Sequence, residues 1–275
     1  MTEEEKQAQS EEKLADNPEP PRIQFDTLQK DLTQREATCS QKFPEEIKAI
    51  QEMIFESMMY GRHISQVKGQ RAKAQGKEIT GARAFPVFYF YRNAWLLLGA
   101  FELCKKGLTS QTITLCRTVV ENILEIYYVL FEKDEITQLF YECKLGKLEE
   151  GLEKKHEHFS QKIIRRALFS KGKQLEMSEY YGTFSEVSHA GITSAETDSL
   201  FSEEDTHDKM ELILHLGAAN IIAITEAELD VIDKTEKEKM DNIVKKIFAK
   251  WGIADLLPDK PELRSKLKIT FNNYR

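Results

Sequence analysis

The chain has 275 residues, of which 41% are hydrophobic and 31% are charged, enough apolar material for one sizeable core beneath a charged surface. Its formal net charge of −7 argues against a dedicated nucleic-acid coat protein, because neutralising phosphates requires a surplus of Lys and Arg. The four cysteines form no CxxC pair, which argues against a zinc ribbon or a thioredoxin-type motif. The acidic N-terminus lacks the apolar segment of a signal peptide, so we expect a cytoplasmic protein.

The N-terminal part of the chain is predicted to be a tail followed by a helical arm. Residues 1–22 are acidic and rich in proline, which is typical of a disordered tail. Residues 23–83 are predicted to form an N-terminal helical arm and a polar loop. A helix is expected to begin at Pro44, because proline suits a first helical turn. From residue 66 to residue 83 the chain is basic and interrupted by glycines, which predicts the loop.

Residues 84–252 are predicted to form the core of an all-α, multi-helix bundle. One helix covers about 85–106 and stops at a glycine. The next, capped by Thr109 or Ser110, runs to about Glu132. So short a connection predicts that the two helices are antiparallel neighbours.

The apolar stretch 84–101 requires comparison with a membrane span. Arg92 and Asn93 lie in its middle, and a spanning helix of about 20 apolar residues resists a central charge. We therefore interpret the stretch as a buried bundle helix and expect no membrane span.

The second half of the chain is also predicted to be helical. A third helix or broken pair covers about 135–169, and another helix covers about 178–192. Ser202, with an acid three residues further on, forms an approximate capping box at the start of a helix that is apolar on nearly all sides, which predicts a place at the centre of the bundle. Thr235 opens another capping box and a helix. Residues 253–275 are predicted to form a basic C-terminal tail.

The first candidate functional group is an Arg–Glu pair. Arg117 and Glu121 are four residues apart, so they share a face at the border of the apolar side of one helix. A charge at such a border is partly desolvated and needs a partner. The pair is interpreted either as a structural ion pair that fixes the helix register or as a clamp for an anionic ligand.

The second candidate group lies on the helix predicted over 178–192. Tyr181, Ser185 and Ser188 share one face, with His189 at its margin. Hydroxyls beside an imidazole could orient a general base, or they could belong to a satisfied network of hydrogen bonds between helices. A Ser–His pair at helical spacing is not a hydrolase signature, because no strand carries a G-x-S-x-G motif.

No pattern in the sequence predicts a metal site or a cofactor. His156 and His158 are two residues apart, so they would point to different faces of a helix. Basic residues cluster on the helix predicted over 154–166, where they form either a solvated face or a contact surface for RNA. A homo-oligomer is an open alternative.

The run GLTSQTITLCRTVVENILEIYY (107–128), followed by Lys144 and by Y-x-x-x-S-x-x-S-H (181–189), resembles a family of all-helical bacterial proteins known as domain of unknown function 5677. The resemblance covers roughly residues 85–225. It implies that the following residues converge between helices: Arg117, Glu121, Lys144, Ser185 and His189.

The sequence favours a non-catalytic helical binding or regulatory module. The alternative is a metal-independent ribonuclease of a toxin or phage-defence system, in which His189 would act as acid and base and Arg117 would stabilise phosphate charge. A loose likeness to HEPN-type helical bundles, many of which are ribonucleases, supports that alternative. Their Arg lies four to six residues before the His, and His189 has no such Arg. Both hypotheses require the helix with Arg117 to meet the helix with His189.

Overall fold

The computed structural model describes residues 25–76, 81–132, 134–144, 159–188 and 201–269, with only the backbone for 81–83, 134, 144 and 180–188. Within these ranges the chain is all-α, as predicted, and contains no strand. The helices are α2 (Phe25–Lys42), α3 (Pro44–Ala74), α4 (Gly81–Lys105), α5 (Thr109–Phe131), α6 (Asp134–Lys144), α8 (Gln161–Leu168), α9 (Lys171–Ser188), α11 (Glu203–Ala227), α12 (Lys234–Trp251) and α13 (Pro261–Arg264).

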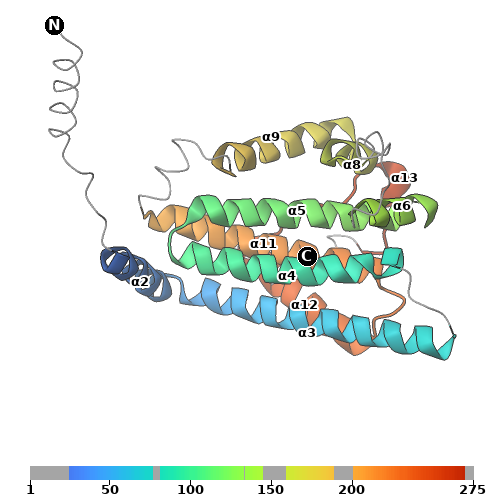
Figure 1. Cartoon of the computed structure of the whole chain (residues 1–275), viewed down its shortest axis with the longest axis horizontal. Coiled ribbons are helices and arrows are strands. Elements are labelled where there is room, and N and C mark those ends of the chain that lie inside the picture. Colours follow the sequence, from blue (N-terminus) through green and yellow to red (C-terminus); the bar gives the residue numbers. More distant parts are fainter. Residues whose placement is uncertain (1–24, 77–80, 133, 145–158, 189–200, 270–275) are drawn as a thin grey trace, which may run out of the picture.

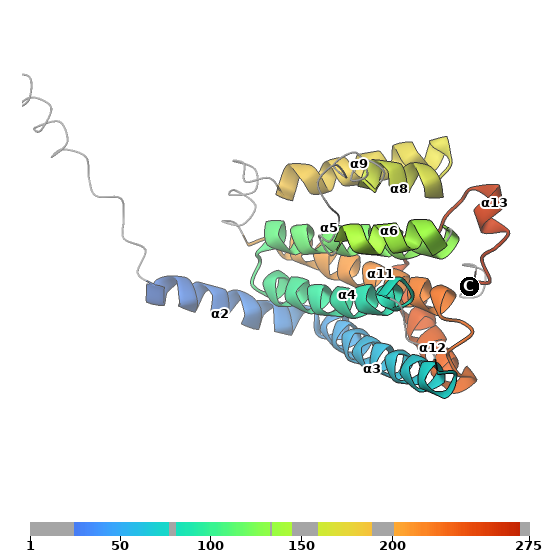
Figure 2. The same ribbon diagram turned by 45° about the vertical axis from the view of Figure 1, so that its right-hand side comes forward.

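Three long helices, α4, α5 and α11, form the centre of the bundle (Figure 1). Figure 2 shows α8 and α9 on one side of this centre and α3 and α12 on the other, while α2 projects away from the bundle. The prediction of a central apolar helix is confirmed by α11, whose residues from Leu216 to Glu226 are all buried. By length and composition α11 could cross a membrane, but 78% of its apolar window is buried inside the bundle, as in a core helix.

A ladder of asparagines joins the three central helices. Asn122 on α5 donates from Nδ2 to Oδ1 of Asn93 on α4 at 2.7 Å. Asn93 in turn donates from Nδ2 to Oδ1 of Asn220 on α11 at 2.8 Å. All three side chains are buried. Because a buried amide must find hydrogen-bond partners, the ladder fixes the relative register of α4, α5 and α11.

Helix α3 continues through Ala74 and α4 begins at Gly81, so the prediction of a loop over residues 66–83 is wrong for 66–74 and for 81–83. Long-range contacts hold this last part of α3. Lys68 Nζ lies 2.6 Å from a carboxylate oxygen of Glu228, and Arg71 donates to the carbonyl of Asp230 at 2.7 Å. These partners follow α11 in the chain, so tertiary contacts decide the helical state of a segment whose local sequence indicates a loop.

Of the two helix caps predicted for the second half of the chain, the first is confirmed and the second is wrong. Ser202 caps α11 as predicted, because its hydroxyl accepts the backbone N–H of Asp205 at 3.2 Å. The cap of α12 is Asp233 instead of Thr235, since the carboxylate of Asp233 accepts the N–H of Glu236 at 2.9 Å. Backbone hydrogen bonding to that N–H lowers the pKa of Asp233.

The connection between α4 and α5 differs from the prediction in its cap. Gly107, at φ +69°, ends α4 as expected for a glycine in the left-handed region. The cap of α5 is Leu108, which makes no side-chain hydrogen bond to the helix. Thr109 and Ser110 are instead buried in the first turn, so the prediction that one of them caps α5 is wrong.

Two segments of the second half of the chain differ from the prediction: the start of α9 and the residues after α12. Helix α9 begins at Lys171, before the predicted start at residue 178, because Ser170 anchors its first turn: the Ser170 hydroxyl donates to Asp259 at 2.5 Å. The chain beyond α12 packs on the bundle through residue 269 and is not a free tail. Glu226 accepts the backbone N–H groups of Lys268 and Ile269, both at 2.8 Å.

Candidate functional site

The predicted pair on α5 is present. Arg117 Nε lies 3.1 Å from Oε1 of Glu121, and both side chains are partly exposed. Helix α5 packs against α9, the helix that carries Tyr181, Ser185 and Ser188 (Figure 1). The helix with Arg117 and the described part of the helix predicted over 178–192 are therefore neighbours.

The predicted convergence of side chains around Arg117 stays a prediction. His189 lies outside the described residues, and the side chains of Lys144, Tyr181, Ser185 and Ser188 are not described. The same holds for part of the basic helix predicted over 154–166, because its first five residues lie outside the described ranges. In its described part, Lys162 and Arg166 are exposed on α8.

The four cysteines are free and buried. Burial raises the pKa of the Cys39 thiol to about 11 and that of Cys116 to about 12. Burial also raises the pKa of Cys104 well above its ordinary value. Because the thiolate is the reactive form of cysteine, none of these three thiols is a nucleophile at neutral pH.

A cavity of about 540 Å³ lies between α9, α11 and the segment that follows α12. We call it the acidic cavity. Apolar residues line part of its wall, including Met177 and Leu256, which are both buried. Its polar lining consists of His215 and of carboxylates from all three segments. These carboxylates are Glu176, Glu179, Asp208, Glu211 and Asp255.

The described lining of the acidic cavity is negatively charged, because it contains five carboxylates and, among the described residues, no Lys or Arg. Asp255 forms an ion pair with Lys173, whose Nζ lies 2.5 Å from Oδ2 of Asp255. Among the described residues, the ionic partner of Glu211 is a distant imidazole, His207, whose Nε2 lies 3.8 Å from Oε1 of Glu211. A hollow lined by charges of one sign concentrates ions of the opposite sign.

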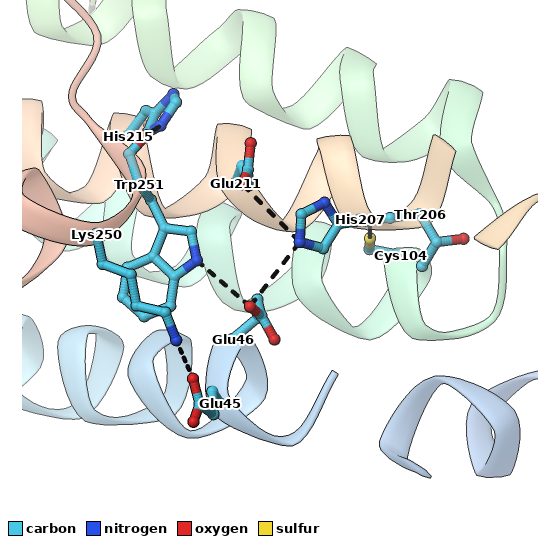
Figure 3. Close-up of polar contacts among 9 residues, drawn as sticks. All are labelled: Glu45, Glu46, Cys104, Thr206, His207, Glu211, His215, Lys250 and Trp251. Atoms are coloured by element: carbon cyan, nitrogen blue, oxygen red, sulfur yellow. Dashed lines mark hydrogen bonds and ion pairs between the residues drawn. The ribbon is translucent and has the colours of Figure 1, made fainter. Parts of the chain in front are cut away.

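A set of polar contacts behind the acidic cavity connects its wall to α3 and α12 (Figure 3). His215 Nε2 lies 2.5 Å from the carbonyl oxygen of Trp251, the last residue of α12, and this contact holds the chain immediately before the cavity-lining segment. The indole N–H of Trp251 points to Glu46 on α3, with a distance of 3.4 Å from Nε1 to Oε1. Glu46 Oε1 is also 3.8 Å from Nε2 of His207.

The described residues contain no group of three or more His, Cys, Asp or Glu side chains arranged to hold a metal ion. The carboxylates of the acidic cavity are therefore distributed around a volume and do not converge on one point. Such an arrangement fits a ligand of several atoms better than a single cation, because a bound metal ion needs its oxygen ligands at about 2.0–2.6 Å.

Sequence reasoning did not single out the carboxylates of the acidic cavity. His215 also lines the acidic cavity, and it is hydrogen-bonded to the carbonyl oxygen of Trp251. A signal was present, because Asp208, Glu211 and His215 follow one another at intervals of three and four residues on one face of a helix. The contributions of α9 and of the chain after α12 have no such signal.

Comparison of the chain with protein-family models, with curated proteins and with solved structures finds no match. The resemblance to domain of unknown function 5677 and the looser likeness to HEPN-type bundles thus stay predictions. Any function assigned to this chain must come from its own residues.

Proposed function

We propose that the protein is a non-catalytic helical binding module whose acidic cavity takes a small organic cation. The observation that carries the proposal is the combination of five carboxylates with apolar residues around one cavity of about 540 Å³. Sites for small molecules have volumes of about 300–1,000 Å³ and combine an apolar wall with a few placed polar groups. The acidic cavity has both properties.

The charge of the lining selects the chemistry of the ligand. A ligand with two or more ammonium groups joined by methylenes would place its charges against Asp208 and Glu211 on one side and Glu176 on the other. Its methylenes would contact the apolar wall at Met177 and Leu212. Charge-assisted hydrogen bonds to carboxylates are about twice as strong as neutral ones, so they would dominate the affinity.

A regulatory role follows from the position of α9. This helix contributes Glu176, Met177 and Glu179 to the acidic cavity, and it also carries Tyr181, Ser185 and Ser188 of the predicted cluster. A ligand bound in the cavity would therefore act on the helix that packs against the Arg117–Glu121 pair on α5. The ribonuclease alternative depends on His189, and no feature of the described residues favours it.

The test is calorimetric titration of the full-length protein with putrescine and spermidine. We expect binding that weakens when NaCl is raised from 50 to 300 mM, because salt screens partly exposed charges. The variant Asp208→Asn/Glu211→Gln removes two cavity charges. We expect it to raise the dissociation constant at least about tenfold, which corresponds to roughly 1.4 kcal/mol.

A matched control removes the same number of charges elsewhere. Glu238→Gln/Glu262→Gln changes two exposed carboxylates on α12 and α13 that do not line the acidic cavity. We expect this control to bind both amines within twofold of the wild type. Absence of amine binding at millimolar concentration, equal loss in both variants, or tighter binding of Mg²⁺ than of the amines would each overturn the proposal.

A further inference from the structure

Helices α3 and α4 expose four large apolar side chains. On α3, Phe55 is 60% and Met59 is 46% exposed, and on α4, Phe88 and Trp95 are each 61% exposed. We call these four residues the apolar strip. Isolated exposed apolar side chains are ordinary on a protein surface, whereas a contiguous set indicates an interaction site.

The packing of α3 on α4 brings the two pairs of apolar residues onto neighbouring helices. A side chain at Gly61 on α3 would contact the rings of Phe90 and Tyr91 on α4, so these positions lie opposite one another. The two helices run in opposite directions (Figure 1). Phe55, which precedes Gly61 by about one and a half turns, therefore comes level with Trp95.

A second exposed apolar surface lies on α2. Phe25 is 75% and Leu28 is 45% exposed, and Leu32 follows them at helical spacing. Only the second half of α2 is anchored to the bundle, through the buried Cys39 and through Glu36, whose Oε1 lies 2.9 Å from Lys105 Nζ. The first half projects away from the other helices (Figure 2), and we call it the arm.

We propose that a second copy of this chain covers the apolar strip, and that the arm of each copy lies on the strip of the other. An amphipathic helix that binds an apolar helix face through residues at i, i+3 and i+7 is an established mode of recognition. Reciprocal exchange satisfies both surfaces at once and closes into a two-fold dimer. This surface is separate from the acidic cavity, so the inference does not depend on the proposed function.

The apolar area of the two surfaces is sufficient for a dimer. At roughly 200 Å² for a large side chain, the exposed fractions amount to roughly 700 Å² in one copy and roughly 1,400 Å² in a pair. Stable interfaces bury about 1,200–2,000 Å² in total. The area buried by the arm alone or by the strip alone would lie below that range, whereas the area buried when each arm covers the strip of the other copy lies within it.

The charges beside the two surfaces are complementary. Asp26 is exposed next to Phe25 on the arm, and Arg62 and Arg92 are exposed beside the strip. Within the described residues, none of these three side chains forms an ion pair. An acidic arm on a strip with a basic border would pair charges that form no ion pair among the described residues of a single chain.

The first test is the oligomeric state of the full-length protein, measured by sedimentation equilibrium between 1 and 100 µM, a range chosen to bracket a dissociation constant of about 10 µM. We expect a wild-type dimer. The strip variant Phe55→Ser/Trp95→Ser and the arm variant Phe25→Ser/Leu28→Ser should each raise the dimer dissociation constant at least tenfold, with unchanged far-ultraviolet circular dichroism. The control Leu175→Ser removes an exposed leucine on α9 and should leave the dimer intact.

The second test locates the contact. A chain with Leu28→Cys is mixed with a chain with Met59→Cys and treated with a short bis-maleimide. The four native cysteines are buried. A crosslink between the two chains is expected, and Leu175→Cys in place of Met59→Cys should give none. A monomer at 100 µM, a dimer unaffected by the arm variant, or binding of the monomer to phosphatidylcholine vesicles through the strip would each overturn the proposal.

Discussion

Removal of the central asparagine of the ladder should destabilise the whole bundle. Asn93 is fully buried and makes two side-chain hydrogen bonds, accepting from Asn122 at 2.7 Å and donating to Asn220 at 2.8 Å. In Asn93→Ala both neighbours lose a partner inside the core. Asn220 retains only a long contact from Nδ2 to the carbonyl oxygen of Phe90, at 3.5 Å.

The expected loss follows from those two orphaned groups. A buried polar group left without a partner costs about 1–3 kcal/mol, so the variant should lose roughly 2–6 kcal/mol of unfolding free energy. The cavity left by the missing amide adds to that loss. A domain of this kind has about 5–15 kcal/mol in total, so Asn93→Ala should be folded but clearly weakened.

A double-mutant cycle separates the ladder from simple loss of volume. Unfolding in urea is followed by circular dichroism for Asn93→Ala, for Asn122→Ala and for the double variant. Because the single variants orphan each other's amides, the double variant should lose at least about 1 kcal/mol less than the sum of the singles. Additive losses, or a loss below about 1 kcal/mol for Asn93→Ala, would refute the reasoning.

Three further predictions concern an ion pair, a helix cap and the alternative function. Burial raises the pKa of Glu228, so its protonation favours the folded state; that gain is complete below about pH 4.5 and is lost as the pH rises through the folded-state pKa. The variant Lys68→Met leaves this buried carboxylate without its cation. It should lower the unfolding free energy, measured in urea, by about 3 kcal/mol at pH 7 and by less at pH 5. A loss that does not depend on pH would contradict the role of Lys68 as the partner of the Glu228 carboxylate. Ser202→Ala should lower the unfolding free energy by about 1 kcal/mol, because the Ser202 hydroxyl caps α11. Thr235→Ala should leave it unchanged, because Asp233 caps α12. Equal effects of the two variants would show that the caps are misassigned. If the protein is a binding module, wild type and His189→Ala should show the same absence of RNA cleavage in EDTA, whereas cleavage by the wild type alone would establish the ribonuclease.

Local features of the candidate site could be predicted, and those that combine distant segments could not. The Arg117–Glu121 pair follows from a spacing of four on one helix, so its formation needs no knowledge of the fold. The acidic cavity combines Glu176, Glu211 and Asp255 from three separate segments. No periodicity relates these residues, because only the packing of α9 on the bundle and the course of the chain after α12 bring them to one volume.

The sequence by itself determined the all-α class, the start of α3 at Pro44, the cap at Ser202 and the central place of α11, because propensity, capping and apolar periodicity act within a few residues. Tertiary structure decided what depends on contacts between distant residues. It kept the end of α3 helical through Lys68 and Glu228, some 160 residues apart, and it aligned the three asparagines of the ladder. Burial and the pairing of charges across the bundle are properties of the packed chain, and a local pattern carries no information about which distant partner will meet it.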